Sequence, residues 1–206
     1  MMESTARVVD VKGNMSLFHG EVGGSTPTTT HKYRIAKCEF SDIAHIFDEF
    51  HYKGKNMGGE ITLCLALTDE FGIIGGAVIG TPRHSVHGEK SLDLRRLACI
   101  DKTAPNTESY FLSKIIWYLK KNTDCRRLIT FADKTVGHKG TIYKAANFKF
   151  IRETSPSKYV MWNGKRYHPR SLSIERDYSH KMREAVKIGE AKLVTGLPKI
   201  LFYYDL

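Results

Sequence analysis

The chain has 206 residues, 41% of them hydrophobic, and its 32 lysine and arginine residues against 22 aspartate and glutamate residues give a net charge of +10 at pH 7. This composition excludes an intrinsically disordered chain, and the lack of any run of about 18 apolar residues excludes a membrane-spanning helix, so we expect a cytoplasmic protein. A chain this basic is typical of proteins that bind a polyanion, with nucleic acid as the first candidate.

The first third of the chain predicts strands around one amphipathic helix. Residues 1–30 form the first predicted region, a strand over residues 5–12 followed by a flexible segment rich in Gly, Ser and Thr. Residues 31–40 predict a strand, and residues 41–52 predict a helix capped by Ser41. The helix ends at His51 and Tyr52, before a basic, glycine-rich loop. His51 is either a capping residue favoured by the helix dipole or a functional residue.

Residues 61–80 predict a hairpin of two apolar strands joined by a polar turn. Gly75 and Gly76, in the second strand, indicate a bulge or a close approach of another backbone. We interpret this as a place where two strands part, and a simple bend of the sheet is the alternative.

Metal and disulfide motifs are weak in this sequence. His84 and His87 are close together in a polar loop, for which a solvated loop is the better interpretation. The four cysteines have no C-x-x-C spacing, so they are expected to be free thiols without a zinc ion: Cys38, Cys64, Cys99 and Cys125.

Residues 91–152 alternate strand, helix, strand, helix and strand, which predicts an α/β protein with a mixed sheet (α+β) and helices packed on it. Arg95 and Arg96 are neighbours in the first of these strands and should point to opposite faces. The loop 101–109 offers Asn106 or Thr107 as the N-cap of the next helix, whose free N–H groups suit an anion.

A second loop, over residues 132–141, follows the next strand of this region. It carries Asp133, His138 and two glycines at the carboxyl end of the strand, where open α/β sheets bind ligands. An aspartate in this position is catalytic or forms only a local turn with its own backbone. Tyr143, one turn into the following helix, is either a half-buried packing residue or a catalytic acid.

The C-terminal residues 156–206 predict a hairpin across Asn163 and Gly164, a basic helix over residues 180–194 and a terminal strand. The hairpin is rich in basic residues interleaved with aromatic residues, a pattern that suits a nucleic-acid backbone and an unstacked base. The alternative is a solvated hairpin with ordinary cross-strand aromatic pairs.

Residues 45–155 resemble a known group of enzymes. A strand, an anion-holding helix start, a second strand and a helix in which Tyr143 precedes Phe148 resemble the GNAT acyltransferase superfamily, and more closely the Mom DNA-modification family of phage Mu and its relatives. The residues that carry the resemblance are His51, Tyr52, Arg95, Arg96, Asn106, Thr107, Glu108, Ser109, Asp133, Gly137, His138 and Tyr143.

The resemblance implies a GNAT-like catalytic core over residues 31–155, with the basic C-terminal extension, residues 156–206, completing the same domain. It implies a phage-encoded enzyme that acts in the bacterial cytoplasm on adenine N6 of double-stranded DNA, making N6-carbamoylmethyl-adenine and so protecting the DNA from restriction. A homodimer is left open. The residues expected to be catalytic are His51, Tyr52, Asp133 and Tyr143, and those expected to bind the donor are Arg96, Asn106, Thr107 and Ser109. The residues expected to contact DNA are Lys53, Lys55, His138, Lys139, Lys158, Trp162, Lys165 and Arg166.

The donor and a metal are less defined. The loop 101–109 departs from the Arg/Gln-x-x-Gly-x-Gly/Ala pattern with which GNAT enzymes hold the pyrophosphate of acetyl-CoA. Acetyl-CoA and an aminoacyl carrier therefore both stay open as donor. Iron has been suspected for the family, and His51, Asp133 and His138 would be its ligands, two histidines and one carboxylate.

Two other functions fit part of the pattern. An acyl-CoA-dependent N-acetyltransferase of a small amine or a protein would share the fold and Tyr143, but would be expected to have the usual pyrophosphate loop. A non-catalytic DNA-binding protein would explain the charge, but not the residues around His51 and Asp133.

Overall fold

The computed structural model describes residues 33–55, 57–82 and 90–206 of the chain. The strand predicted over residues 5–12, the flexible segment after it, and His84 and His87 lie outside these residues. The helices and strands are β1 (Arg34–Cys38), α1 (Phe40–Phe50), β2 (Ile61–Thr68), β3 (Ile73–Gly80), β4 (Ser91–Cys99), α2 (Thr107–Asn122), β5 (Arg127–Asp133), α3 (Thr141–Ala145), β6 (Lys149–Glu153), β7 (Lys158–Trp162), β8 (Lys165–Tyr167), α4 (Asp177–Lys187), β9 (Lys192–Thr195) and β10 (Lys199–Asp205). None of the helices in this part of the chain has the length and apolar content needed to cross a lipid bilayer.

The chain divides into two compact units, described separately below. Unit 1 comprises Met1–Phe131, Thr141–Phe150 and Phe202–Leu206, and unit 2 comprises Ala132–Gly140 and Ile151–Leu201. The boundary falls within β5, β6 and β10.

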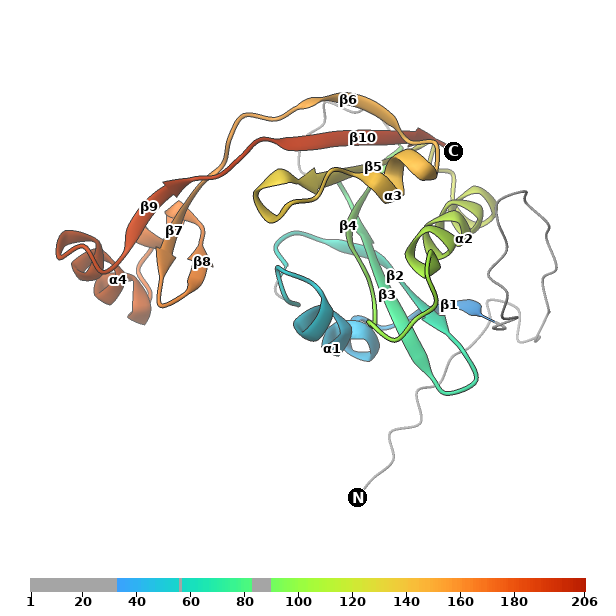
Figure 1. The fold of residues 1–206 in the computed structure, drawn as a ribbon, viewed down its shortest axis with the longest axis horizontal. Coiled ribbons are helices and arrows are strands. Elements are labelled where there is room, and N and C mark those ends of the chain that lie inside the picture. The colour runs from blue at the N-terminus through green and yellow to red at the C-terminus, as the bar shows by residue number, and fades with distance from the viewer. Residues whose placement is uncertain (1–32, 56, 83–89) are drawn as a thin grey trace, which may run out of the picture. The chain divides into compact units, whose positions relative to one another are not determined.

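The main sheet has seven strands in the order β1-β2-β3-β4-β5-β10-β6 (Figure 1). Strands β1 to β4 pair antiparallel in chain order, and β5 joins β4 in parallel. This arrangement confirms the predicted α/β class with a mixed sheet. The last strand of the chain, β10, lies between β5 and β6 in the sheet. The basic segment 154–198 therefore connects β6 to β10, which are neighbouring strands.

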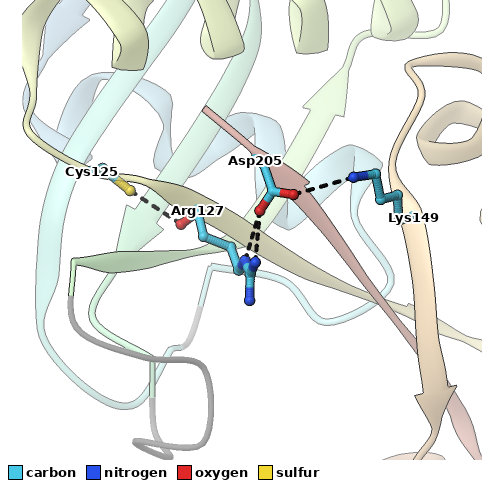
Figure 2. A network of polar contacts seen from close by, with 4 residues as sticks. All are labelled: Cys125, Arg127, Lys149 and Asp205. Atoms are coloured by element: carbon cyan, nitrogen blue, oxygen red, sulfur yellow. Dashed lines mark hydrogen bonds and ion pairs between the residues drawn. The ribbon is translucent and has the colours of Figure 1, made fainter.

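A cross-strand charge network joins these three strands within unit 1 (Figure 2). Asp205 of β10 accepts two hydrogen bonds from Arg127 of β5, at 2.9 and 2.8 Å, and forms an ion pair of 3.3 Å with Lys149 of β6. The ring of Tyr203 lies under both cations, 4.5 Å from the Arg127 guanidinium and 5.5 Å from the Lys149 amine. Opposite charges on adjacent strands thereby fix the position of β10.

Helix α1 packs on the sheet through Ile43, Ile46 and Phe47, which are fully buried against Cys64, Ala66, Val78 and Ala98. Gly76 makes this close packing possible. A Cβ atom on Gly76 would lie 3.0 Å from Ile43 Cβ and 3.1 Å from Phe47 Cζ. The close approach at Gly76 is made by side chains of α1, not by another backbone as predicted.

Two boundaries differ from the prediction. Helix α1 is capped by Glu39, whose side chain accepts from the backbone of Asp42 while the Asp42 side chain accepts from the Glu39 backbone, so the predicted cap at Ser41 is wrong. The reciprocal pair of acidic side chains satisfies two N–H groups, which one serine could not. The helix predicted over residues 180–194 ends at Lys187, just before Gly189 at φ 83°, and Lys192–Thr195 forms β9.

Unit 2 contains a three-stranded sheet in the order β8-β7-β9 with α4 packed on it. The predicted hairpin between β7 and β8 is confirmed, with Asn163 at φ 49° and Gly164 at φ 71°, as a tight two-residue turn requires. The small core is built from Val160 of the sheet and Met182 and Ala185 of α4.

All four cysteines of the chain are free thiols, as predicted.

Candidate functional site

Strands β4 and β5 part in the middle of the main sheet. Their parallel pairing begins with Ser91 beside Arg127 and ends with Leu94 beside Thr130, although β4 continues to Cys99. Beyond this point β4 stays paired with β3 on its other side. The predicted parting at Gly75 and Gly76 is wrong, because both glycines pair with β2 and with β4 at once.

Tyr143 of α3 lies at the point where these two strands part. Its phenol is hydrogen bonded to Thr130, and the Thr130 hydroxyl also donates to the carbonyl of Leu94 at 3.2 Å. The tyrosine ring packs against Phe148 and Phe202, with centroids 5.6 and 5.7 Å away. Burial raises the pKa of Tyr143 above its usual value, and the hydrogen bond with Thr130 opposes that rise only in part. The side chain is thus held as a protonated phenol, the form that a general acid needs.

A cavity of about 280 Å³ opens at the start of α2, beyond the carboxyl end of β4. Asn106 precedes the helix in the left-handed conformation at φ 68°, and Ser109 in the first turn also lines the cavity. Thr107 is buried, and its hydroxyl donates to the carbonyl of Ala104 at 2.6 Å, so it shapes the loop. The first N–H groups of a helix have no partners within it, and they make this cavity suitable for a polar or anionic group.

The same cavity is lined by the residue before Tyr143 and by two carboxylates, and Tyr143 itself is not among its lining residues. Ile142, which precedes Tyr143, lines it together with Asp101 and Glu108. No lysine or arginine is among the residues that line it, so a diphosphate would rely on N–H groups alone. Cys99 also lines the cavity, but burial raises the pKa of its thiol to about 12, which makes it a poor nucleophile.

His51 and Tyr52 begin the loop that follows α1. The Nδ1 atom of His51 accepts a hydrogen bond of 3.2 Å from the Lys53 N–H, and the His51 ring stacks on the Tyr52 ring at 4.8 Å. The Lys53 amine lies 5.0 Å from the centre of the Tyr52 ring. His51 is also the C-cap of α1, through its N–H to the Phe47 carbonyl. His51 therefore caps the helix through its backbone, and a functional role for its side chain stays a prediction. The imidazole and the half-exposed Tyr52 ring lie at the start of the loop.

Two arginines of β4 hold this loop. Arg95 donates to the carbonyls of Gly58, at 3.3 Å, and Thr81, at 2.6 Å, while Arg96 reaches the carbonyl of Gly54 at 3.5 Å. The prediction that the two arginines point to opposite faces is wrong. Val78 pairs with Arg96 and Ile79 pairs with Leu94, so Arg95 is the extra residue of a bulge, and alternation fails there.

The predicted residues of the second loop belong to unit 2. Asp133 is buried and its Oδ1 accepts from the Thr135 N–H at 3.0 Å, which makes it the N-cap of the short 3-10 helix Lys134–Val136. The His138 N–H donates to the Asp133 carbonyl at 3.2 Å, and the side chains of His138 and Lys139 are exposed. The local-turn alternative for Asp133 is present, and its catalytic role stays a prediction.

The structure gives the expected iron ligands no support. Among residues 33–55, 57–82 and 90–206, no three His, Cys, Asp or Glu side chains are grouped as metal binding requires. The donor atoms Nδ1 of His51 and Oδ1 of Asp133 accept hydrogen bonds from backbone N–H groups instead. The residues present therefore do not fit an iron centre.

The residues predicted to contact DNA are divided between the two units. In unit 1, Lys55 forms an ion pair of 2.7 Å with Asp48, which fixes the loop after α1. Lys158, Trp162, Lys165 and Arg166 of unit 2 all belong to β7 and β8. Sequence reasoning missed Thr130, because a threonine inside an apolar strand gives no signal until its partners are known.

The Mom protein family matches residues 32–198 of this chain, a range that includes both strands that part, Tyr143 and the loop after α1. The chain belongs to the Mom family. Among curated proteins, no sequence matches it. The family match supports a Mom-like role in DNA modification and a transferase activity.

Solved structures show that this Mom chain has the GNAT acyltransferase fold. A Bacillus subtilis acetyltransferase in complex with CoA superposes with a TM-score of 0.51 at 9% identity, over 85% of this chain and 99% of that chain. An Acinetobacter baylyi acetyltransferase gives 0.52 at 9% identity, over 87% and 95%. A ribosomal-protein-alanine N-acetyltransferase of Escherichia coli gives 0.50 at 14% identity, over 84% and 93%.

Proposed function

We propose that this chain is a phage-encoded transferase that modifies adenine N6 in double-stranded DNA, by carbamoylmethylation of the Mom kind, and so protects that DNA from restriction. The observation that carries the proposal is the position of Tyr143. In a chain of the Mom family, its phenol is hydrogen bonded to Thr130, at the last pair before β4 and β5 separate.

The transfer needs an acid and a base. In the product the new bond joins N6 to the methylene carbon of the carbamoylmethyl group. Adenine N6 therefore attacks that carbon, a C–N bond forms, the bond from that carbon to its carrier breaks, the carrier leaves with its electron pair, and N6 loses a proton. Tyr143 is suited to protonate the leaving group, since its phenol stays protonated. His51 and Asp133 are both candidates for the base. The hydrogen bond from the Lys53 N–H places the proton of a neutral His51 on Nε2, so a base role for His51 requires that bond to break.

The cavity at the start of α2 is the proposed donor site, with Asn106, Ser109 and the helix N–H groups as its polar contacts. An acyl-CoA is supported by the fold, since the similar Bacillus subtilis enzyme holds CoA. An aminoacyl carrier is supported by the absence of a lysine or arginine among the residues that line the cavity.

The loop after α1 is the proposed acceptor side. A base inside a duplex must be flipped out before an enzyme can reach its N6, and a flipped base is held by stacking and by cations on the flanking phosphates. Tyr52 and Lys53 offer both kinds of contact from one loop, and Arg95 and Arg96 hold the backbone of that loop.

The test is nucleoside mass spectrometry of plasmid DNA from bacteria that express the chain. We expect a modified deoxyadenosine whose mass and fragments identify the transferred group. The Tyr143→Phe variant, which keeps the ring but lacks the proton donor, should lower the yield about 100-fold or more. Unmodified DNA from cells with soluble wild-type protein, or full modification by the Phe variant, would contradict the proposal.

Two further variants and one ligand refine the test. His51→Gln and Asp133→Asn, compared at equal protein levels, show which candidate base the reaction needs. Acetyl-CoA is then added to the purified protein in a thermal melt, because a ligand that binds only the folded state raises Tm. A rise in Tm without any DNA modification would favour an N-acetyltransferase of another amine.

A further inference from the structure

The three-stranded sheet of unit 2 has two unlike faces. Val160 is buried in the core with Met182 and Ala185 of α4, so its face of β7 is covered by the helix. Successive residues of a strand point to opposite faces, and directly paired residues share a face. Met161 pairs with Arg166 on β8 and with Lys192 on β9. The residues on the face away from α4, called the outer face below, are Tyr159, Met161, Arg166, Lys192 and Val194.

The outer face presents two cations on a rigid base. Arg166 and Lys192 are exposed and flank Met161 on neighbouring strands, about 10 Å apart across the sheet at the usual strand spacing. The Arg166 guanidinium lies over the Tyr159 ring, 4.7 Å from its centre, which restricts its orientation. One surface therefore holds both charges ready for a single polyanion.

Unit 2 carries most of the net charge of the chain. It contains thirteen lysine and arginine residues and six acidic residues, so seven of the ten net positive charges belong to it. Three of the acidic side chains pair with Lys134, Arg183 and Lys187. Among the described residues, Arg166 and Lys192 form no ion pair of this kind, and their charge is available to a ligand.

We propose that the outer face of unit 2 binds the sugar-phosphate backbone of double-stranded DNA, with Arg166 and Lys192 on phosphate oxygens and Tyr159 holding the guanidinium. The identity of the polyanion rests on the proposed function, and the surface itself rests on the charge and the strand register. Glu190 lies with Lys192 around a hollow of about 330 Å³ at the hairpin end of the sheet. Because that carboxylate repels phosphate, the Arg166 side carries the closer contact.

The proposal separates the basic residues of this hairpin by face. Lys158 and Lys165 belong to the face covered by α4, since Lys165 pairs with Trp162, two residues from the buried Val160. Lys158 alternates in phase with Val160 along β7. These two lysines therefore provide a control with the same charge, in the same three-stranded sheet but on the opposite face.

The experiment measures binding of the full chain to a labelled DNA duplex over a range of salt concentrations. The double variant Arg166→Gln with Lys192→Gln should weaken binding about tenfold or more, and should reduce the slope of log affinity against log salt by about two units. The double variant Lys158→Gln with Lys165→Gln, which loses the same charge, should keep most of the affinity and the slope. Circular dichroism and Tm confirm that each variant is folded.

Several outcomes would overturn the inference: no duplex binding by the wild-type chain, equal losses in the two double variants, or preferential binding of an RNA duplex. The same variants are also expressed in cells for nucleoside mass spectrometry. Binding that depends on the outer face, without modified adenine in any sample, would support the inference and contradict the proposed function. If the Arg166→Gln and Lys192→Gln double variant bound DNA as well as wild type and the adenine were modified normally, the result would contradict the inference and support the proposed function.

Discussion

At the scale of single residues, Thr130 joins the sheet to the proposed acid. Its hydroxyl contacts both the Leu94 carbonyl and the Tyr143 phenol, and it is buried. Thr130 is the last residue of β5 that pairs with β4, and its hydrogen bond with Tyr143 orients the phenol. Thr130 acts through Tyr143 and is a positioning residue.

Replacing Thr130 tests this role. Thr130→Val keeps the shape but removes the hydroxyl, and the loss of one hydrogen bond, about 1 kcal/mol, should lower the yield of modified adenine five- to tenfold. Thr130→Ser, which restores the hydroxyl, should recover most of that yield. Nucleoside mass spectrometry gives the yields, and thermal melts show whether the protein stays folded. If Thr130→Ser were as impaired as Thr130→Val, the methyl group rather than the hydroxyl would be the important part.

At the scale of elements, the contact between α1 and β3 depends on Gly76. A Cβ atom there would be about 3 Å from atoms of Ile43 and Phe47. We expect Gly76→Ala to destabilise the protein by about 1–3 kcal/mol, as overpacking does, measured by urea unfolding. Phe47→Leu removes the ring atom in the way, so the double variant should be more stable than the sum of the two single effects predicts. Additive effects would show that the strain lies elsewhere.

Sequence patterns predicted the elements better than their junctions. The apolar periodicity of residues 107–122 gave α2, whose buried face includes Phe111, Leu112 and Ile115, and the dipeptide Asn163-Gly164 gave the β7–β8 turn. Strand β9 was missed, because its pairing with β7 is a contact between segments about 30 residues apart that no local pattern encodes. The bulge at Arg95 was missed for the same reason, since a bulge is a property of two strands together.

The candidate site follows the same rule. Tyr143 and the start of α2 were named as candidates from local sequence and the family resemblance, whereas the parting of the strands was placed at the wrong position, since it lies between β4 and β5. Glycines mark close packing as well as irregular backbone, and in this chain Gly76 marks the packing of α1. Only the register distinguishes the two.

At the scale of the whole molecule, Asp205 links β10, the last strand of the chain, to both of its neighbours in the main sheet. The hydrogen bonds from Arg127 are the main cause that lowers the pKa of Asp205 in the folded protein, and Lys149 adds to the effect. A lowered pKa means that the carboxylate stabilises the fold above its unfolded pKa of about 3.9, and that this contribution is lost as the pH falls through the folded value.

The variant Asp205→Asn measures this contribution. At pH 7 it should lower the free energy of unfolding by about 1 kcal/mol or less, since the pair is partly exposed and screened by solvent. The difference from wild type should begin to shrink below about pH 4, and should approach zero only when the pH is below the lowered pKa of the folded state, where the wild-type carboxyl is protonated. Urea unfolding at both pH values provides the comparison. A difference that persists in acid would assign the effect to packing rather than charge.

The place of β10 in the sheet also has a consequence for how the chain is made. Strand β10 is synthesised after both of its neighbours, β5 and β6, yet it lies between them. Until it emerges from the ribosome, each neighbour presents an open strand edge, the kind of surface on which nascent chains aggregate. The more than 40 residues that separate β6 from β10 set the length of that exposed interval, so a ribosome that stalls within residues 154–198 leaves the main sheet without the strand between β5 and β6.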